Sequence, residues 1–387
     1  SSGGRGSSTI PDQLMNVKQV RATEHAFAAI RADGTAVSWG DVNFGGDSST
    51  VKEQLVKVQQ IQANDDAFAA IRSDGTVVAW GDPFCGGNST PVQEQLVNVH
   101  QLHATGAAFA AIRNDGTVVT WGDDHSGGDS TAVQDQLVNV QTIQGNANAF
   151  AALKSDGTVV TWGHPQDGGD STAVKSKLVS IREIKKNRVA FCAIRSDGTV
   201  VTWGSPQSGG NSSAVHQELV NVKKIVSTEA AFAALRNDSH VVVWGHHKTA
   251  GNSKAVQKQL VNVEELYATE GAFAALKRND RTVVTWGDRL DGGNSTAVQN
   301  QLVNVKVIKA NECAFAALRS DGIVVTWGHP DSGGNSSAVQ DQLVNVMQLH
   351  ATRFAFAAIR NDGRLVTWGD KMCGGNSAAV QDLLAWV

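Results

Sequence analysis

Cysteine, proline and tyrosine are scarce in this 387-residue sequence, with four, six and one copies. The four cysteines are too few and too irregularly spaced for a disulfide framework, and no CxxC pair indicates a zinc site. No apolar run approaches the roughly 20 residues that cross a bilayer, so we expect no membrane span. The 33 basic and 37 acidic residues give a net charge of −4. Without a clustered basic surface, we expect no direct binding to nucleic acid.

Catalytic signatures are also missing. The sequence has no P-loop, no GxSxG elbow, no HExxH spacing and no paired-carboxylate pattern. We therefore predict that the chain is not an enzyme and holds no cofactor and no metal. Asp41 and Asp47 bracket a glycine pair, which allows a calcium site or an Asx cap of a turn. Capping is favoured because turns and helix starts prefer these side chains.

The positions of the cysteines bear on the compartment. Cys192 replaces an Ala in an apolar strand, which predicts a buried free thiol. Cys85 and Cys373 take the same place in two repeats, and a disulfide between them is the alternative. We expect a reducing compartment, the cytoplasm or the nucleus. Residues 1–8 predict a flexible linker with no signal peptide, followed by one repeat domain at 9–387.

The main feature of the sequence is internal repetition. A Trp-Gly pair recurs every 41 residues, with one interval of 42. A Phe precedes each Trp by 12 residues, except between Phe273 and Trp286, where one residue is inserted. Nine copies with a single insertion indicate a repeat architecture. The repeated tryptophans are Trp39, Trp80, Trp121, Trp162, Trp203, Trp244, Trp286, Trp327 and Trp368.

Each repeat predicts three strands and a short helical turn. Residues 140–146 indicate a first strand with one wetter face, 149–154 a second strand that is apolar on both faces, and 158–162 a β-branched third strand. The Ser-Asp-Gly turn at 155–157 joins the last two strands as a hairpin. Residues 131–134 (TAVQ) fit a capping box ahead of one or two helical turns. The predicted fold class is all-β, with nine such units.

A unit of this size cannot bury its apolar faces alone, so neighbouring units must stack. We interpret the repeated Phe and Trp as core between successive units, because Val and Ala flank them. A ring of exposed aromatics that stack on sugars or bases is the alternative.

The stretch from Ala149 to Gly169, AFAALKSDGTVVTWGHPQDGG, resembles the repeat of the regulator of chromosome condensation (RCC1) family. The resemblance covers residues 9–387 and is closest to the short-period HERC/RCC1-like repeat proteins. It implies a β-propeller-like toroid, with smaller blades that number nine. Ala149-Phe150 replaces the His with which the family commonly starts its second strand. No unit carries a long insertion like the one that engages a small GTPase, so the resemblance does not extend to nucleotide exchange.

The ends leave two architectures open. The helical segment occurs ten times and the hairpin nine times, since the last Leu of the segment recurs from Leu14 to Leu384. A closed ring of nine units needs only nine such segments. The array is therefore either a ring with overlapping ends or an open β superhelix, capped by the altered finish at 383–387.

Two loops vary between repeats: the one between the first and second strands, and the one after Trp-Gly. In an up-and-down unit both project from the same end, and variable loops on a rigid scaffold commonly bind partners. Relaxed constraint on loop tips would produce the same variation. The candidate binding residues are Glu24, Asp65, Arg188, Glu229, Glu270, Glu312, Arg353, Phe44, Phe84, His164, His246 and His329.

Three functions follow from these observations. The first is a non-enzymatic interaction scaffold that binds a protein partner through the variable loops. The second is a lectin-like or small-ligand binder with one shallow site per unit, which predicts weak multivalent binding. The third, an RCC1-like chromatin or small-GTPase regulator, is implied by the resemblance alone.

Overall fold

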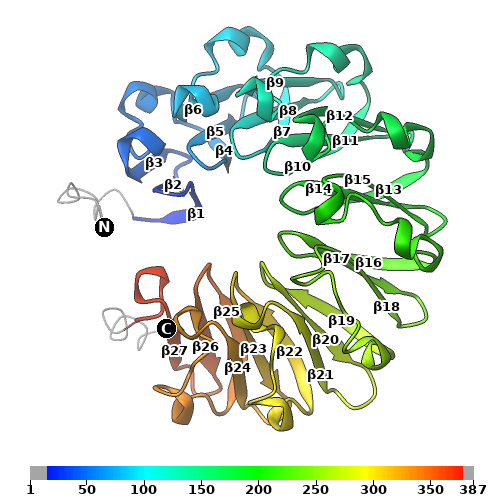
Figure 1. Ribbon diagram of the computed structural model, residues 1–387. Helices are drawn as coiled ribbons and strands as arrows, with labels where there is room; N and C mark the ends of the chain where they lie inside the picture. The colour runs from blue at the N-terminus through cyan, green and yellow to red at the C-terminus, as the bar shows by residue number, and fades with distance from the viewer. Residues whose placement is uncertain (1–14, 378–387) are drawn as a thin grey trace. The chain divides into compact units, whose positions relative to one another are not determined.

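The computed structural model describes residues 15–377. In this range the chain forms nine three-stranded antiparallel sheets, in which strand order follows sequence order (Figure 1). This confirms the predicted all-β class and the three-stranded unit. The first strands are β1 (Val17–Ala22), β4 (Val58–Ala63), β7 (Val99–Ala104), β10 (Val140–Gly145), β13 (Ile181–Lys186), β16 (Val222–Ser227), β19 (Val263–Ala268), β22 (Val305–Ala310) and β25 (Val346–Ala351).

The second and third strands form the hairpin of each repeat. The second strands are β2 (Ala26–Arg31), β5 (Ala67–Arg72), β8 (Ala108–Arg113), β11 (Ala149–Lys154), β14 (Ala190–Arg195), β17 (Ala231–Arg236), β20 (Ala272–Lys277), β23 (Ala314–Arg319) and β26 (Ala355–Arg360). The third strands are β3 (Ala36–Gly40), β6 (Val77–Gly81), β9 (Val118–Gly122), β12 (Val159–Gly163), β15 (Val200–Gly204), β18 (Val241–Gly245), β21 (Val283–Gly287), β24 (Val324–Gly328) and β27 (Leu365–Gly369).

An Asp-Gly turn fixes seven of the nine hairpins, and Asp238-Ser239 and Asp280-Arg281 take its place in the sixth and seventh repeats. In the fourth repeat the Asp156 carboxylate accepts hydrogen bonds from the Thr158 backbone N–H (2.9 Å) and hydroxyl (2.6 Å). Gly157 takes a φ of 78°, which only glycine adopts without strain. The Gly157 carbonyl then accepts from the Ile181 N–H of the next repeat at 2.8 Å. The turn therefore closes its own hairpin and also contacts its neighbour.

The hydrophobic core lies between successive repeats. Phe150 is fully buried and its ring stacks on Trp162 at 5.1 Å. Both pack with Ala110 and Ile112 of the preceding repeat, and the Trp162 indole N–H donates to the Gly127 carbonyl there at 3.0 Å. The interpretation of the repeated Phe and Trp as core is confirmed for the second to ninth repeats, whereas Phe27 of the first repeat is exposed.

Gly127 shows why a glycine pair follows eight of the nine tryptophans, Ala250-Gly251 replacing it in the sixth repeat. A Cβ atom at Gly127 would lie 2.6 Å from Cδ2 of Phe150, and its φ is 96°. At this backbone conformation a side chain would be strained and would press on the Phe150 ring, whereas the equivalent Ala250 of the sixth repeat has no positive φ and packs in the core with Phe273.

Two short helical turns separate the third strand from the next repeat, except in the sixth repeat, where residues 247–251 form a non-helical turn in place of the first. The first, which follows Trp-Gly, is η1 (Val42–Phe44), η3 (Pro83–Gly87), η5 (Asp124–Ser126), η7 (Pro165–Asp167), η9 (Pro206–Ser208), η12 (Arg289–Gly293), η14 (Pro330–Ser332) or η16 (Lys371–Cys373). The second is η2 (Ser49–Gln54), η4 (Thr90–Gln95), η6 (Thr131–Gln136), η8 (Thr172–Lys177), η10 (Ser213–Glu218), η11 (Gln257–Gln259), η13 (Gln299–Gln301) or η15 (Gln340–Gln342).

The predicted capping box is wrong. The N-cap of η6 is Ser130 rather than Thr131, and its side chain makes no capping hydrogen bond to the backbone. Instead the Ser130 hydroxyl donates to the Gln134 side chain at 2.8 Å, and the Gln134 amide donates to the Val118 carbonyl at 2.9 Å. The same Gln recurs in several repeats, where this side chain ties the helical turn to the third strand.

The chain divides into two compact units. The first unit holds the repeats of β1 to β15, apart from residues 197–200. The second unit holds the repeats of β16 to β27 together with residues 197–200. The choice between a ring and an open superhelix, and the single domain at 9–387, stay predictions. The linker at 1–8, Leu14, Leu384 and the altered finish at 383–387 lie outside the described residues.

All four cysteines are free thiols, so the alternative of a disulfide between Cys85 and Cys373 is wrong. Cys192 is fully buried, as predicted. Within residues 15–377, no helix is long and apolar enough to cross a membrane.

Candidate functional site

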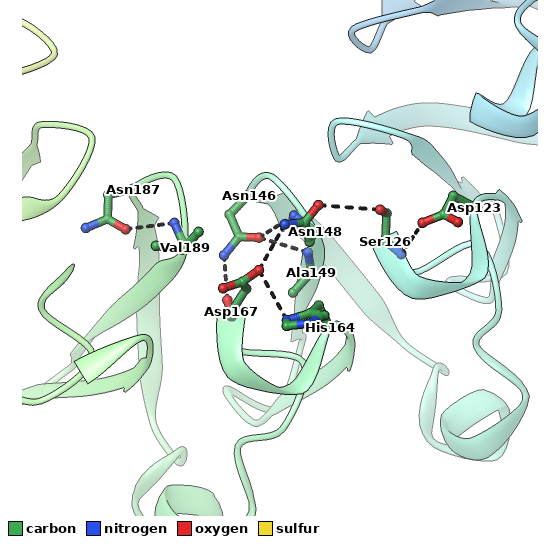
Figure 2. A network of polar contacts seen from close by, with 9 residues as sticks. All are labelled: Asp123, Ser126, Asn146, Asn148, Ala149, His164, Asp167, Asn187 and Val189. Carbon is green, nitrogen blue, oxygen red and sulfur yellow. Dashed lines mark hydrogen bonds and ion pairs between the residues drawn. The ribbon is translucent and has the colours of Figure 1, made fainter. Parts of the chain in front are cut away.

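Each repeat brings two loops together at the end of the sheet that lies opposite the Asp-Gly turn. We call the loop between the first and second strands the connecting loop, the segment after Trp-Gly the tip loop, and the surface that both form the loop face. In the fourth repeat the Asn146 amide donates to the Asp167 carbonyl of the tip loop at 2.6 Å (Figure 2). Asn146 also accepts from the backbone N–H groups of Asn148 (3.0 Å) and Ala149 (2.8 Å).

The equivalent residue is Asn or Thr in every repeat, and either side chain can make both contacts. Thr105 donates to the Ser126 carbonyl at 2.9 Å and accepts from the Ala108 N–H at 3.0 Å. One short polar side chain therefore holds both loops in place. The two variable loops lie at the same end because this residue joins them.

The connecting loops form a backbone ladder that the sequence did not indicate. The central residue of each loop donates its N–H to the carbonyl of the equivalent residue in the next repeat. In the first unit the N···O distances are 2.9 Å for Glu24 to Asp65, 3.2 Å for Asp65 to Gly106, 2.8 Å for Gly106 to Ala147 and 2.9 Å for Ala147 to Arg188. In the second unit they are 2.8 Å for Glu229 to Glu270, 2.8 Å for Glu270 to Glu312 and 3.2 Å for Glu312 to Arg353.

This ladder places the predicted charged residues side by side. In the second unit Glu270 lies between Glu229 and Glu312, and partial burial and the charges of Glu312 and Glu229 raise its pKa to about 7. Arg353 ends the row, and its Nε lies 2.7 Å from Oε1 of Glu312. The second unit thus presents an acidic row closed by one cation.

The first unit carries a sparser row. Partial desolvation raises the pKa of Asp65, and the charges of Glu24 and Asp66 raise it further, while Arg188 opposes them. Gly106 and Ala147 interrupt the charges. The structure brings Glu24, Asp65 and Arg188 into one row, and Glu229, Glu270, Glu312 and Arg353 into another.

Several tip loops are tight turns capped by an Asp at their first position. Asp123 accepts from the Ser126 N–H at 2.8 Å, and Asp82 accepts from the Phe84 N–H at 2.7 Å. The Asp41 and Asp47 carboxylates likewise accept from the N–H groups two residues on, at 2.9 and 2.8 Å. The first residue of the tip loop therefore shapes the turn where it is Asp. Residues 15–377 contain no group of three or more His, Cys, Asp or Glu side chains that could hold a metal ion.

The three candidate histidines occupy this first position, and neither His164 nor His329 caps its turn. His164 Nδ1 lies 3.2 Å from the Asp167 carboxylate of the same tip loop (Figure 2). His246 Nδ1 lies 3.3 Å from the Thr249 hydroxyl. They contribute to three separate tip loops and do not form a cluster with one another.

The fourth residue after each Trp lies at the tip and includes large exposed apolar side chains. Phe84 is 84% exposed, Leu290 64% and Met372 92%. Phe84 was a predicted candidate, whereas Leu290 and Met372 were missed. The variation that predicted this loop is at the first residue after Trp-Gly, whereas the apolar tips lie at the fourth residue after Trp. An alignment of this fourth residue across the repeats shows both apolar side chains, and the six repeats without one have Asn43, His125, Gln166, Gln207, Lys248 and Asp331 there.

The other aromatic candidate, Phe44, offers less surface. It is half-buried, makes an edge contact with the His25 ring at 4.5 Å and packs against the core between the first two repeats.

Each apolar tip lies beside a charged connecting loop. Next to Phe84, the Cys85 thiol donates to the Asp66 carboxylate at 3.4 Å. A Cβ atom at Gly271, the residue after Glu270, would clash with the Asp291 carboxylate next to Leu290. The Thr352 hydroxyl, next to Arg353, donates to the Cys373 carbonyl at 2.8 Å.

The thiols on the loop face are poor nucleophiles. Burial, followed by the carboxylate of Asp66, raises the pKa of Cys85 to about 12. Burial and the charge of Asp291 raise the pKa of Cys313 to about 12 as well. Because the thiolate is the reactive form, neither thiol is activated at neutral pH.

No protein-family model matches the chain, and no curated protein matches it. Among solved structures it is similar to Prp20p of Saccharomyces cerevisiae, a protein with binding properties to Gsp1p and histones, at 16% identity over 86% of this chain and 76% of that one (TM-score 0.40). It is also similar to the ectodomain of the Physcomitrella patens receptor kinase CR4, at 16% identity over 70% and 73% (TM-score 0.37). The computationally designed Ika8 protein is 16% identical over 92% and 96% (TM-score 0.34).

Proposed function

We propose that this chain is a non-enzymatic scaffold that binds a protein partner through its loop face. The observation that carries the proposal is the set of exposed apolar tips, Phe84, Leu290 and Met372, on capped turns. Isolated exposed apolar residues are common on protein surfaces, but these three share one structural position. A large apolar side chain held on a rigid turn loses little conformational entropy when a partner covers it.

The charged rows beside these tips supply the rest of a protein interface. Interfaces combine a few buried anchors with a polar rim. Phe84 lies beside Asp65 and Asp66, and Leu290 beside Glu270. The proposed partner therefore has an apolar patch with basic groups at its edge, and binding weakens as salt screens the rim.

The proposal is tested by capture from a native lysate. The tip variant carries Phe84→Ser, Leu290→Ser and Met372→Ser. The matched control carries Val97→Ser, Val138→Ser and Val179→Ser, three apolar side chains that are 38–40% exposed. These valines lie at the opposite end of the sheets, next to the Asp-Gly turns. The residue after each valine accepts a hydrogen bond from the N–H of such a turn, as the Asn98 carbonyl does from Asn114 at 2.8 Å.

We expect the wild-type chain and the control to capture the same protein, and the tip variant to capture it at least about tenfold less, the loss that about 1.4 kcal/mol produces. Equal capture by the tip variant and the control would overturn the assignment of the site. If no form captures a protein, the scaffold proposal fails, and glycan and small-ligand arrays become the appropriate assay.

A further inference from the structure

The first repeat exposes a sheet face that every other described repeat buries. Phe27 is 46% exposed and Val20 45%, whereas the equivalent Phe68 and Ile61 are 0% and 1% exposed. The equivalent face of the second repeat, with Phe68 and Trp80, packs on the second and third strands of the repeat before it. Residues 15–377 provide no such repeat ahead of β1.

The Trp39 indole likewise lacks the contact that the later repeats make with a preceding repeat. In each later repeat the equivalent indole N–H donates to a carbonyl of the preceding repeat, as Trp80 does to Gly45 at 3.1 Å and Trp368 to Gly333 at 3.0 Å. Trp39 stacks on Phe27 at 5.4 Å, but its N–H has no carbonyl partner among residues 15–377. The first repeat therefore presents an apolar face with one directed donor.

The last repeat presents the complementary half of this interface. Ile359 and Leu365 are half-exposed, whereas the equivalent Leu318 and Val324 are 2% and 0% exposed. A Cβ atom at Gly333 would lie 2.7 Å from the next repeat's Phe356. At the equivalent Gly374 the nearest neighbour of such a Cβ is Cγ2 of Thr352 at 3.9 Å. The place that a following Phe would fill is open in the described residues.

We propose that the face of the first repeat takes the last repeat of a second copy of this chain, head to tail. Phe27 occupies the place beside Gly374, and the Trp39 indole N–H donates to the Gly374 carbonyl. The internal interfaces supply the template, because each joins the same two faces by the same contacts. Such a heterologous contact adds copies in one direction, and the proposal stands apart from the loop-face function.

Two variants that are blocked at opposite faces test this proposal. Phe27→Glu blocks the face of the first repeat, and Ile359→Glu blocks that of the last. Because both positions are at least partly exposed, each variant is expected to fold, which circular dichroism checks. Phe84→Glu, on the loop face, is the control. Self-association is followed by sedimentation velocity over about a hundredfold range of micromolar concentrations.

We expect the wild-type chain and the Phe84→Glu control to gain mass as concentration rises, and each blocked variant alone to stay at 40.8 kDa. An equimolar mixture of the two blocked variants should form a dimer of twice that mass, because one intact pair of faces remains. If the wild-type chain stays monomeric over this range, either each chain covers its own face or the two faces do not pair, and the proposal is overturned whatever the mixture does.

Discussion

One phenylalanine in each repeat after the first contributes strongly to the packing between neighbours. Phe150 is fully buried, stacks on Trp162 at 5.1 Å and fills the space that Gly127 leaves open. Truncation to Ala would leave a cavity that the surrounding strands cannot close. We expect Phe150→Ala to lower the free energy of unfolding by about 3–5 kcal/mol, measured by denaturant unfolding.

Phe27→Ala is the matched control for this substitution, because Phe27 holds the same place in the first repeat and is 46% exposed. In dilute solution it should cost less than about half as much, since less apolar surface is lost from the interior. Equal losses for the two variants would contradict the account of the inter-repeat core.

The periodicity of the sequence predicted which residues form the core, but it did not reveal which partner each polar side chain binds. The Phe and Trp spacing indicated the core because the same burial recurs in each unit. The spacing of Thr131 and Gln134 suggested a capping box, but Gln134 binds the Val118 carbonyl of the third strand. A side chain that reaches another element leaves the same spacing as one that caps its own helix.

The connecting loops of successive repeats are joined by backbone hydrogen bonds. Hydrogen bonds between successive loops hold Glu229, Glu270 and Glu312 in adjacent places, so their charges interact. The sequence showed that these residues are equivalent, but it could not show that they touch. Equivalent residues of a repeat become neighbours only where the geometry of stacking brings their loops within hydrogen-bonding distance.

This arrangement predicts a pH dependence of stability. The Glu270 pKa is raised from 4.5 to about 7 in the folded chain, so the folded state binds more protons than the unfolded state between these values. Stability therefore falls as pH rises through this window and is greatest, with respect to this group, below pH 4.5. Thermal unfolding between pH 4.5 and 8 should show this decline, with the folded-state titration of Glu270 near pH 7.

Two substitutions isolate the contribution of Glu270. Glu270→Gln should reduce the decline, because the titrating group is gone. Glu229→Gln should move the titration to lower pH, because one neighbouring charge no longer raises the Glu270 pKa. An unchanged pH profile in both variants would show that the acidic row does not interact as described.

The whole molecule combines a repeated scaffold with loops that differ. The strands, Asp-Gly turns and aromatic pairs recur because each must fit the same neighbour, and these features made the fold predictable from the sequence. The tips face no neighbour, so packing does not dictate whether the residue is Phe84, Gln166 or Asp331. Sequence reasoning located the variable loops, but the exposed apolar tips Phe84, Leu290 and Met372, which we propose as anchors, emerged only from the structure.

Site-specific photo-crosslinking in a native lysate tests whether a protein binds the loop face. A photoreactive side chain is placed singly at Phe84, Leu290 or Met372, and at Val97, Val138 or Val179 as controls. Binding at the loop face predicts one crosslinked protein that is shared by the tip positions and absent from the control positions. The same protein crosslinked equally from the control positions, or no protein crosslinked from any tip, would contradict it.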